Sequence, residues 1–254
     1  MEDIKTKHHV HVPKRVREYM IELLSTFIAV ALAFLSQYYF QYRSDRSTEH
    51  DLMVSLIADL RLDSKNIQKL SDKFSDLDDP ARELAQSCRS FPTSLSEQTH
   101  LYDLVLSISL KPFQIDFSTA TINQLKNSGG LRLVQYHEIT DAITRYDNEI
   151  HHMEILQENV IMRKKEFFDN MSINLYTDAI TFYPVISLNK KLLQSLYKDR
   201  GTTLISKDAN SLIQLGNLAV SFTTYAAGYI GYANRQKSEG DKLISLIQSH
   251  YHIE

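Results

Sequence analysis

The side chains that could perform chemistry are few in this 254-residue chain. Asp147 and His151 stand one helical turn apart, with His152 and Glu154 close by. Two ligands at that spacing can hold a metal ion. A third and a fourth ligand are not evident in the sequence, so a solvated helix face explains the group better. We therefore predict no metal site.

Other groups of side chains could bind small ligands. His8, His9 and His11 could capture a stray metal ion, but they also fit an unstructured tail. The basic runs 163–165 and 190–191 could meet a phosphate-bearing ligand, and scattered surface charge explains them as well. The sequence contains no nucleotide-binding glycine loop, no nucleophile elbow and no paired-cysteine motif. We expect no enzyme and no cofactor.

Composition excludes several classes of protein. The net charge is -3, which argues against a basic surface that wraps duplex nucleic acid. One cysteine, Cys88, excludes an internal disulfide framework. Glycine and proline are scarce, with seven and five residues, so few positions break a helix. The predicted fold class is all-α.

The longest uncharged stretch near the start predicts a transmembrane helix. Twenty residues, Leu23 to Tyr42, carry no charge. As a helix they would be about 30 Å long, roughly the hydrocarbon thickness of a bilayer. Tyr19 before the stretch and Tyr38 and Tyr39 at its far end fit interfacial aromatic belts. Two alternatives stay open: a signal peptide cleaved near Ala31-Leu32-Ala33, and a buried soluble helix.

Small and polar side chains share one face of this predicted helix. The face consists of Glu22, Ser25, Thr26, Ala29, Ala33, Ser36 and Gln37. Because lipid tails are as apolar as leucine, helices associate in membranes through close backbone approach and polar contacts. We call this set the polar stripe and predict that it mediates self-association or lines a narrow water path.

Glu22 allows two interpretations. An ionisable group at a membrane boundary is costly unless it is paired, protonated or hydrated, which favours a functional role. It could equally rest among lipid headgroups at the edge of the helix. The positive charges around the helix bear on orientation: five precede it (Lys5, Lys7, Lys14, Arg15 and Arg17) and two follow it closely (Arg43 and Arg46). This bias favours a cytoplasmic N-terminus and a body outside.

The rest of the chain is predicted to form a helical body. The predicted domains are a basic, histidine-containing tail (1–18), a transmembrane helix (19–42) and a soluble domain (43–254) with a stalk over about 43–75 and a bundle over 80–254. Within the bundle we expect helices at 80–88, around 101–108, at 118–126, from 136 to 180 with a bend or a break near 170–172, at 188–196, at 207–233 and at 237–251.

Two of these helices have informative patterns. From Ile139 to Met153 the apolar residues step by four and three, which is the spacing of a coiled coil. The segment 209–234 carries no charge and could be a second span, but its Asn, Gln, Thr and Tyr side chains favour a buried soluble helix. Gly216, Gly228 and Gly231 would allow tight helix contacts there.

One segment resembles a known family. Thr121-Ile-Asn-Gln-Leu-Lys-Asn-Ser-Gly-Gly-Leu-Arg-Leu-Val, followed by Glu138-Ile-Thr-Asp-Ala-Ile-Thr-Arg-Tyr, is similar to a bacterial family of uncharacterised single-pass membrane proteins. Its members pair a Glu-led N-terminal span with a helical body that contains a Leu-x-x-Ser-Gly-x-Leu-x-Leu turn. The matching turn residues here are Leu125, Ser128, Gly129, Leu131 and Leu133, and the leading acid is Glu22. The family often has a tryptophan-containing stretch after the span, whereas this sequence has no tryptophan.

The resemblance carries a functional expectation. Some bacterial anti-phage systems, the Hailong type among them, use a membrane effector of this layout under the control of a nucleotide-polymerising enzyme. The resemblance implies that this chain is a homo-oligomeric inner-membrane effector. Its body would sense a nucleotide ligand or a partner nucleotidyltransferase, and the effector would then open an ion channel or disrupt the lipid membrane. That mechanism requires the body to lie in the cytoplasm, whereas the positive charges before the helix favour a body outside. The alternative is a membrane-anchored adaptor that docks a partner in the cell envelope.

Overall fold

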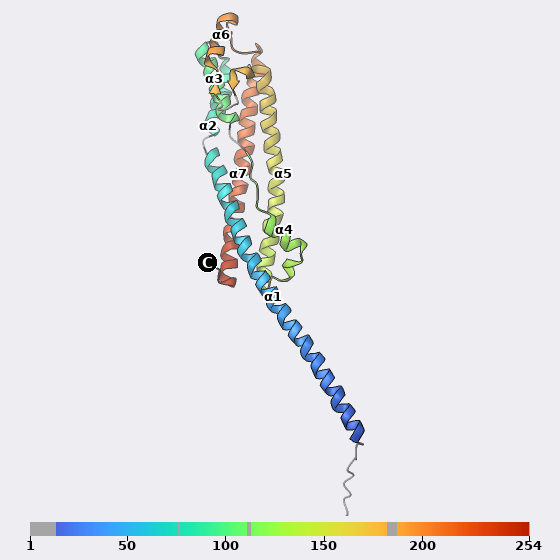
Figure 1. Cartoon of the computed structure of the whole chain (residues 1–254). Helices are drawn as coiled ribbons and strands as arrows, with labels where there is room; N and C mark the ends of the chain where they lie inside the picture. Colours follow the sequence, from blue (N-terminus) through green and yellow to red (C-terminus); the bar gives the residue numbers. More distant parts are fainter. Residues whose placement is uncertain (1–13, 76, 111–112, 182–186, 254) are drawn as a thin grey trace, which may run out of the picture. The chain divides into compact units, whose positions relative to one another are not determined.

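The computed structural model describes residues 14–75, 77–110, 113–181 and 187–253 (Figure 1). The protein is all-α, as predicted, with two short strands. The helices are α1 (Lys14–Phe74), α2 (Asp78–Ser90), α3 (Leu95–Ser109), α4 (Ala120–Asn127), α5 (His137–Asn174), α6 (Lys190–Arg200) and α7 (Ala209–Tyr251), with 3-10 turns η1 (Gly130–Arg132) and η2 (Thr177–Ala179). Strands β1 (Ile180–Thr181) and β2 (Ser187–Leu188) pair antiparallel, with Ile180 opposite Leu188.

The chain divides into two compact units, Met1–Asp51 and Leu52–Glu254. Helix α1 runs through the boundary, so the predicted stalk over 43–75 falls partly in each unit. The first unit contains the apolar helix. The second unit contains all the other helices, and we call it the body.

The body is organised around α7. This helix packs along α5 and along α2, and Figure 1 shows α5 and α7 side by side. Buried side chains form two clusters. One joins the body part of α1 to α4, α5 and the end of α7, and includes Met53, Ile143 and Ile247. The other joins α2 and α3 to the far halves of α5 and α7, and includes Phe167 and Phe222.

The apolar pattern of α5 lies in these clusters, as predicted, and α7 is a buried helix, as predicted for 209–234. The buried side chains of α5 include Ile139, Ile143, Tyr146, Ile150 and Met153, and those of α7 include Leu212, Leu215, Ala219, Phe222, Ala226 and Tyr229. Segment 209–234 is therefore a core helix. Among the described residues, one helix near the N-terminus is long and apolar enough to cross a membrane.

Several predicted boundaries are wrong. Helix α5 continues through 170–172 because Asn170 and Asn174 satisfy each other within the helix: the Asn174 side-chain amide donates to the carbonyl of Asn170 over 2.9 Å. Residues 209–251 form one helix rather than two, since Gln236 is buried in the predicted gap and donates to the Tyr146 carbonyl. Leu188 lies in β2 and not in α6.

The glycines of α7 differ from the prediction too. At Gly216 an added Cβ would lie 2.7 Å from the Ala85 Cα, so α7 and α2 do approach closely there. At Gly228 and Gly231 an added Cβ would meet nothing within 4 Å. The tight contact is confirmed for Gly216 and wrong for the other two.

Candidate functional site

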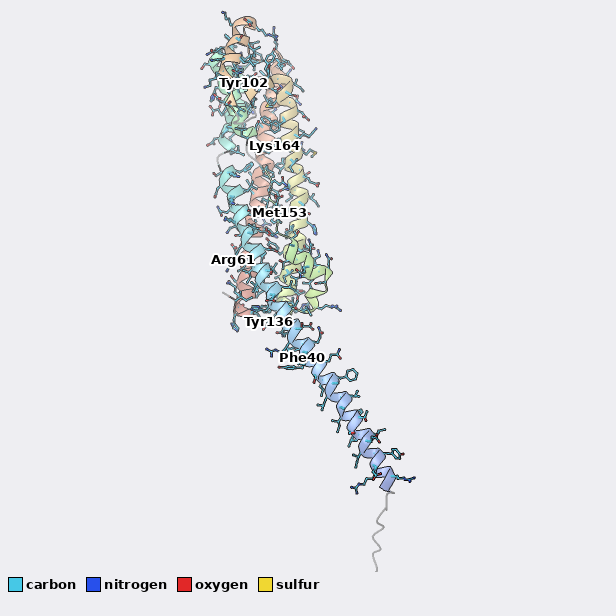
Figure 2. All side chains as sticks on the ribbon, viewed as in Figure 1. Phe40, Arg61, Tyr102, Tyr136, Met153 and Lys164 are labelled. Carbon is cyan, nitrogen blue, oxygen red and sulfur yellow. The ribbon has the colours of Figure 1, made fainter. Side chains whose placement is uncertain are left out.

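The apolar part of α1 exposes large hydrophobic side chains on all sides. Phe27 and Phe40 are each 70% exposed, and Phe40 points away from the helix axis in Figure 2. The most apolar window has no residue buried inside the structure. Exposed apolar patches of this extent mark a surface that contacts a membrane or another protein. By its length and composition this helix can cross a membrane.

The polar stripe lies on that helix with every one of its side chains exposed. The Ser25 hydroxyl donates to the Glu22 carbonyl over 2.8 Å, and the Thr26 hydroxyl donates to the same carbonyl over 2.9 Å. These two hydroxyls are thus satisfied within the helix, as polar groups in lipid must be. Ala29 and Ala33 remain open to a neighbouring helix.

The turn that carries the family resemblance is a packed corner. Leu125 is buried against the cluster that contains Ile139, and Leu131 is half-buried beside it. The Ser128 hydroxyl donates to the Gln124 carbonyl at the end of α4, and Gly129 has a φ of 72°. That left-handed conformation favours glycine. Leu133 follows η1 and is half-buried. These residues shape the corner between α4 and α5.

The residues considered for metal or phosphate binding are engaged elsewhere. The Lys126 ammonium lies 2.6 Å from the Asp147 carboxylate, and His151 lies 3.1 Å from Glu154. In the part of the chain that the structure describes, no three His, Cys, Asp or Glu residues form a metal-binding group. His8, His9 and His11 lie outside the described residues.

The basic run 163–165 is likewise held along α5. The Arg163 guanidinium lies 2.8 Å from Glu166, and Lys165 lies 3.1 Å from Asp169. Burial lowers the pKa of the Lys164 ammonium, which lies over the Phe168 ring. Lys190 and Lys191 are exposed in the first turn of α6.

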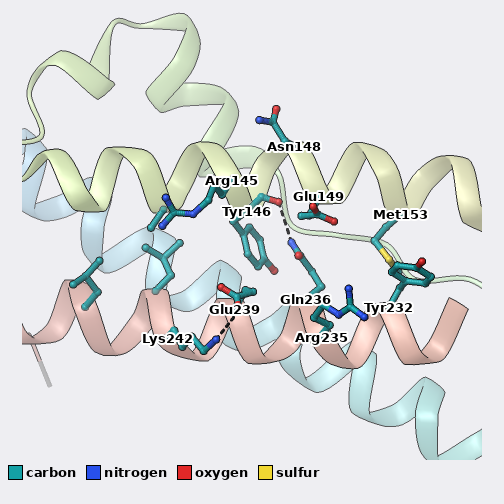
Figure 3. A pocket seen from close by; sticks show the side chains of 13 residues that line it. Arg145, Tyr146, Asn148, Glu149, Met153, Tyr232, Arg235, Gln236, Glu239 and Lys242 are labelled. Atoms are coloured by element: carbon teal, nitrogen blue, oxygen red, sulfur yellow. Dashed lines mark hydrogen bonds and ion pairs between the residues drawn. The ribbon is translucent and has the colours of Figure 1, made fainter. Parts of the chain in front are cut away.

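A groove between α5 and α7 is the site that the sequence reasoning missed (Figure 3). It has a volume of about 580 Å³, within the range of small-molecule sites. Buried side chains of Tyr146, Met153, Gln236 and Leu243 contribute to its lining. Charged residues of both helices lie exposed along its edges: Arg145, Glu149, Arg235, Glu239 and Lys242.

A buried polar centre lies beneath this groove. The Tyr146 hydroxyl donates to the Asp63 carboxylate over 2.9 Å, and the Ser118 N–H donates to the same carboxylate over 2.7 Å. The Gln236 amide donates to the Tyr146 carbonyl over 2.9 Å. Burial raises the pKa of the Asp63 carboxyl and that of Tyr146. Tyr146 therefore connects the groove to α1 by a direct hydrogen bond.

Comparisons with protein-family models, curated proteins and solved structures return no match for this chain. The resemblance at the turn and the span thus stays a prediction.

Proposed function

We propose that this chain is an oligomeric membrane effector of bacteria, in which the body controls the association of apolar helices in the inner membrane. One observation carries the proposal: an apolar helix with a polar stripe belongs to the same unbroken helix, α1, as Met53 and Leu56 in the core of the body. A change in the packing of the body can therefore act directly on α1.

The polar stripe supports association of several copies. A helix that only anchors a protein needs no face of small and polar residues, whereas helices that meet in lipid need close backbone approach. Ala29 and Ala33, four residues apart, permit that approach. Ser36 and Gln37 add side chains that can hydrogen-bond between copies or face water. Displacement of these helices by the body would open an ion path or disrupt the bilayer.

The resemblance supports a role in anti-phage defence. In that setting the body senses a nucleotide ligand or a partner nucleotidyltransferase, and it faces the cytoplasm where such a signal arises. Glu22 then lies at the entrance of the path.

A membrane-anchored adaptor is the second candidate, and one feature of α5 favours it. Ile155, Met162 and Ile173 are exposed and fall within about 20° of one line along the helix, because they are separated by 7 and 11 residues. Such a line of apolar side chains suits docking of a partner. The excess of positive charge before the span supports this candidate as well, since it places the body outside.

Liposome leakage tests the effector proposal. Ala33→Leu inserts bulk where two helices would meet, so we expect it to weaken the oligomer in detergent and to change the rate of ion leakage by about tenfold or more. Ala31→Leu, on the other face, is the matched control and should leave both unchanged. Equal effects of the two variants would remove the special role of the stripe. A wild-type protein that never leaks, with or without its trigger, would favour the adaptor.

Orientation is tested by thiol labelling from outside intact cells. Cys88 cannot report it, because this thiol is buried and burial raises its pKa to about 12. Ser238→Cys places a thiol at an exposed position of α7. We expect an impermeant reagent to label this variant only after the membrane is opened. Labelling of intact cells would place the body outside and contradict the effector mechanism.

A further inference from the structure

We infer that the α5–α7 groove binds a small organic anion that carries a planar ring and N–H donors, and that this ligand acts on α1 through Tyr146. Its effect on leakage rests on the proposed function, whereas binding itself does not. The inference begins from the charges along the groove, which follow from how α5 and α7 are paired.

The two helices run antiparallel in a fixed register. At one end the ring of Tyr136 contacts the ring of Tyr251, and further along the Tyr229 hydroxyl donates to the Gln157 side chain over 3.0 Å. In Figure 3, Arg145 of α5 and Lys242 of α7 lie toward the same end of the groove, Glu239 lies beside Tyr146, and Glu149 lies further along, near Gln236. Two cations thus lie toward one end of the groove, and the two carboxylates follow at successive positions along it.

Side chains of the protein satisfy these charges only in part. The Lys242 ammonium lies 2.6 Å from Glu239, and the Arg235 guanidinium lies over the Tyr232 ring with 5.2 Å to its centroid. Arg145 has no ion-pair partner among the described residues. A guanidinium in this state offers paired N–H donors that match a phosphate or a carboxylate.

The middle of the groove offers acceptors. Gln236 is only 4% exposed, and its amide nitrogen donates to the Tyr146 carbonyl. Within the described part of the chain no donor reaches the oxygen of that amide. This oxygen is not among the side-chain atoms that are buried without a partner, so it stays accessible to solvent in the groove and can accept a hydrogen bond from a ligand. Glu149 and Glu239 add carboxylates beside it, so the ligand needs N–H groups here.

The far end of the groove suits a planar apolar group. Met153 and Tyr232 line it, and the sulfur and ring are favourable neighbours for an aromatic system. An anionic group against Arg145, N–H donors against Gln236 and Glu239, and a ring against Tyr232 therefore define one molecule. Its size must suit a groove of about 580 Å³.

A ligand bound in the groove can affect α1 through a residue that lines the groove. Tyr146 lines the groove, and its hydroxyl donates to the buried Asp63 carboxylate of α1. A ligand that moves Tyr146 changes this hydrogen bond. Because Asp63 also accepts the Ser118 N–H, the change extends to the segment before α4. Tyr146 is thus a positioning residue for α1.

Binding is tested on the full-length protein in detergent by calorimetry, with adenosine monophosphate as the probe. We expect the probe to bind, and both adenosine, which lacks the phosphate, and ribose 5-phosphate, which lacks the ring, to bind more weakly. Arg145→Gln should weaken binding of the monophosphate about tenfold or more. Arg61→Gln removes an exposed guanidinium outside the groove and should change it less than about twofold.

Two results would overturn the site. The first is no binding of the monophosphate at millimolar concentration, which is also the result expected if another protein chain covers the groove. The second is an equal loss in Arg145→Gln and Arg61→Gln, because binding would then depend on charge anywhere on the surface.

The link to α1 is tested by Tyr146→Phe in leaking liposomes. This variant keeps the ring in the groove and removes the hydrogen bond to Asp63, so we expect binding within about twofold and a lost response of leakage to the probe. Tyr136→Phe, at the residue directly before α5, is the control and should keep both the binding and the response of leakage to the probe. A full response in Tyr146→Phe would reject the link. Binding by the wild type without any change in leakage would keep the site and reject its link to α1. Leakage without binding would reject the site and keep the effector proposal, and a wild type that never leaks would reject the effector proposal alone.

Discussion

Gly216→Val should strongly destabilise the body. A Cβ at Gly216 would lie 2.7 Å from the Ala85 Cα and 3.2 Å from the Cys88 Cβ. The first atom is backbone, so relief requires α2 and α7 to move apart along a long buried contact. Overpacking of this kind costs about 1–3 kcal/mol, and we expect the upper end of that range. Urea unfolding of the full-length protein in detergent, followed by circular dichroism, measures it.

Gly228→Ala is the matched control on the same helix. A Cβ at this position meets nothing within 4 Å, so only the backbone effect of the substitution remains. Replacement of an exposed helical glycine by alanine stabilises a helix by about 0.5–1 kcal/mol. The two variants should therefore shift the unfolding midpoint in opposite directions. A stabilising effect of Gly216→Val would mean that α2 and α7 do not touch there.

The fold class and the core faces could be predicted from the sequence because they depend on periodicity. The apolar steps of α5 from Ile139 to Met153 place one side of the helix in the core, whatever packs against it. The same holds for the apolar residues of α7 from Leu212 to Tyr229, which also lie on one side of their helix. These patterns involve residues close together in the sequence, so they can be recognised in one sequence without knowledge of the packing partners.

Helix ends were predicted less well because they depend on distant partners. The gap expected near Gln236 is absent, since that side chain finds the Tyr146 carbonyl of another helix. A break at 170–172 is absent, and the Ser211 hydroxyl donates to the side-chain oxygen of Asn174 and keeps this polar end of α5 satisfied. In both places a polar side chain is buried in the helix with a partner, and Ser211 and the Tyr146 carbonyl lie far away in sequence.

The groove could not be predicted for a related reason. Arg145, Glu149, Glu239 and Lys242 each look like ordinary residues of a solvated helix face. They form a site only because α5 and α7 run antiparallel in one register. The signal that could have found it is the unusual burial of Gln236 and Tyr146 between them, and burial of a polar residue is visible only in the folded body.

Leu32→Arg should have the largest effect on where the protein resides. Leu32 lies near the middle of the uncharged stretch and is 57% exposed. If lipid surrounds it, replacement of leucine by arginine changes the insertion free energy by about 3–4 kcal/mol, which is several hundredfold in the ratio of inserted to non-inserted protein. We expect most of the protein to leave the membrane fraction after alkaline extraction.

Leu62→Arg separates this interpretation from a general intolerance of α1 to charge. Leu62 belongs to the same helix and is similarly exposed, at 49%, but it lies within the body. Arginine there meets water, so the protein should stay in the membrane fraction with an unchanged unfolding midpoint. If Leu32→Arg also stays membrane-bound, then lipid does not surround the centre of this helix. Its exposed apolar side chains would in that case serve contacts with other protein chains, and the membrane effector would have to be abandoned.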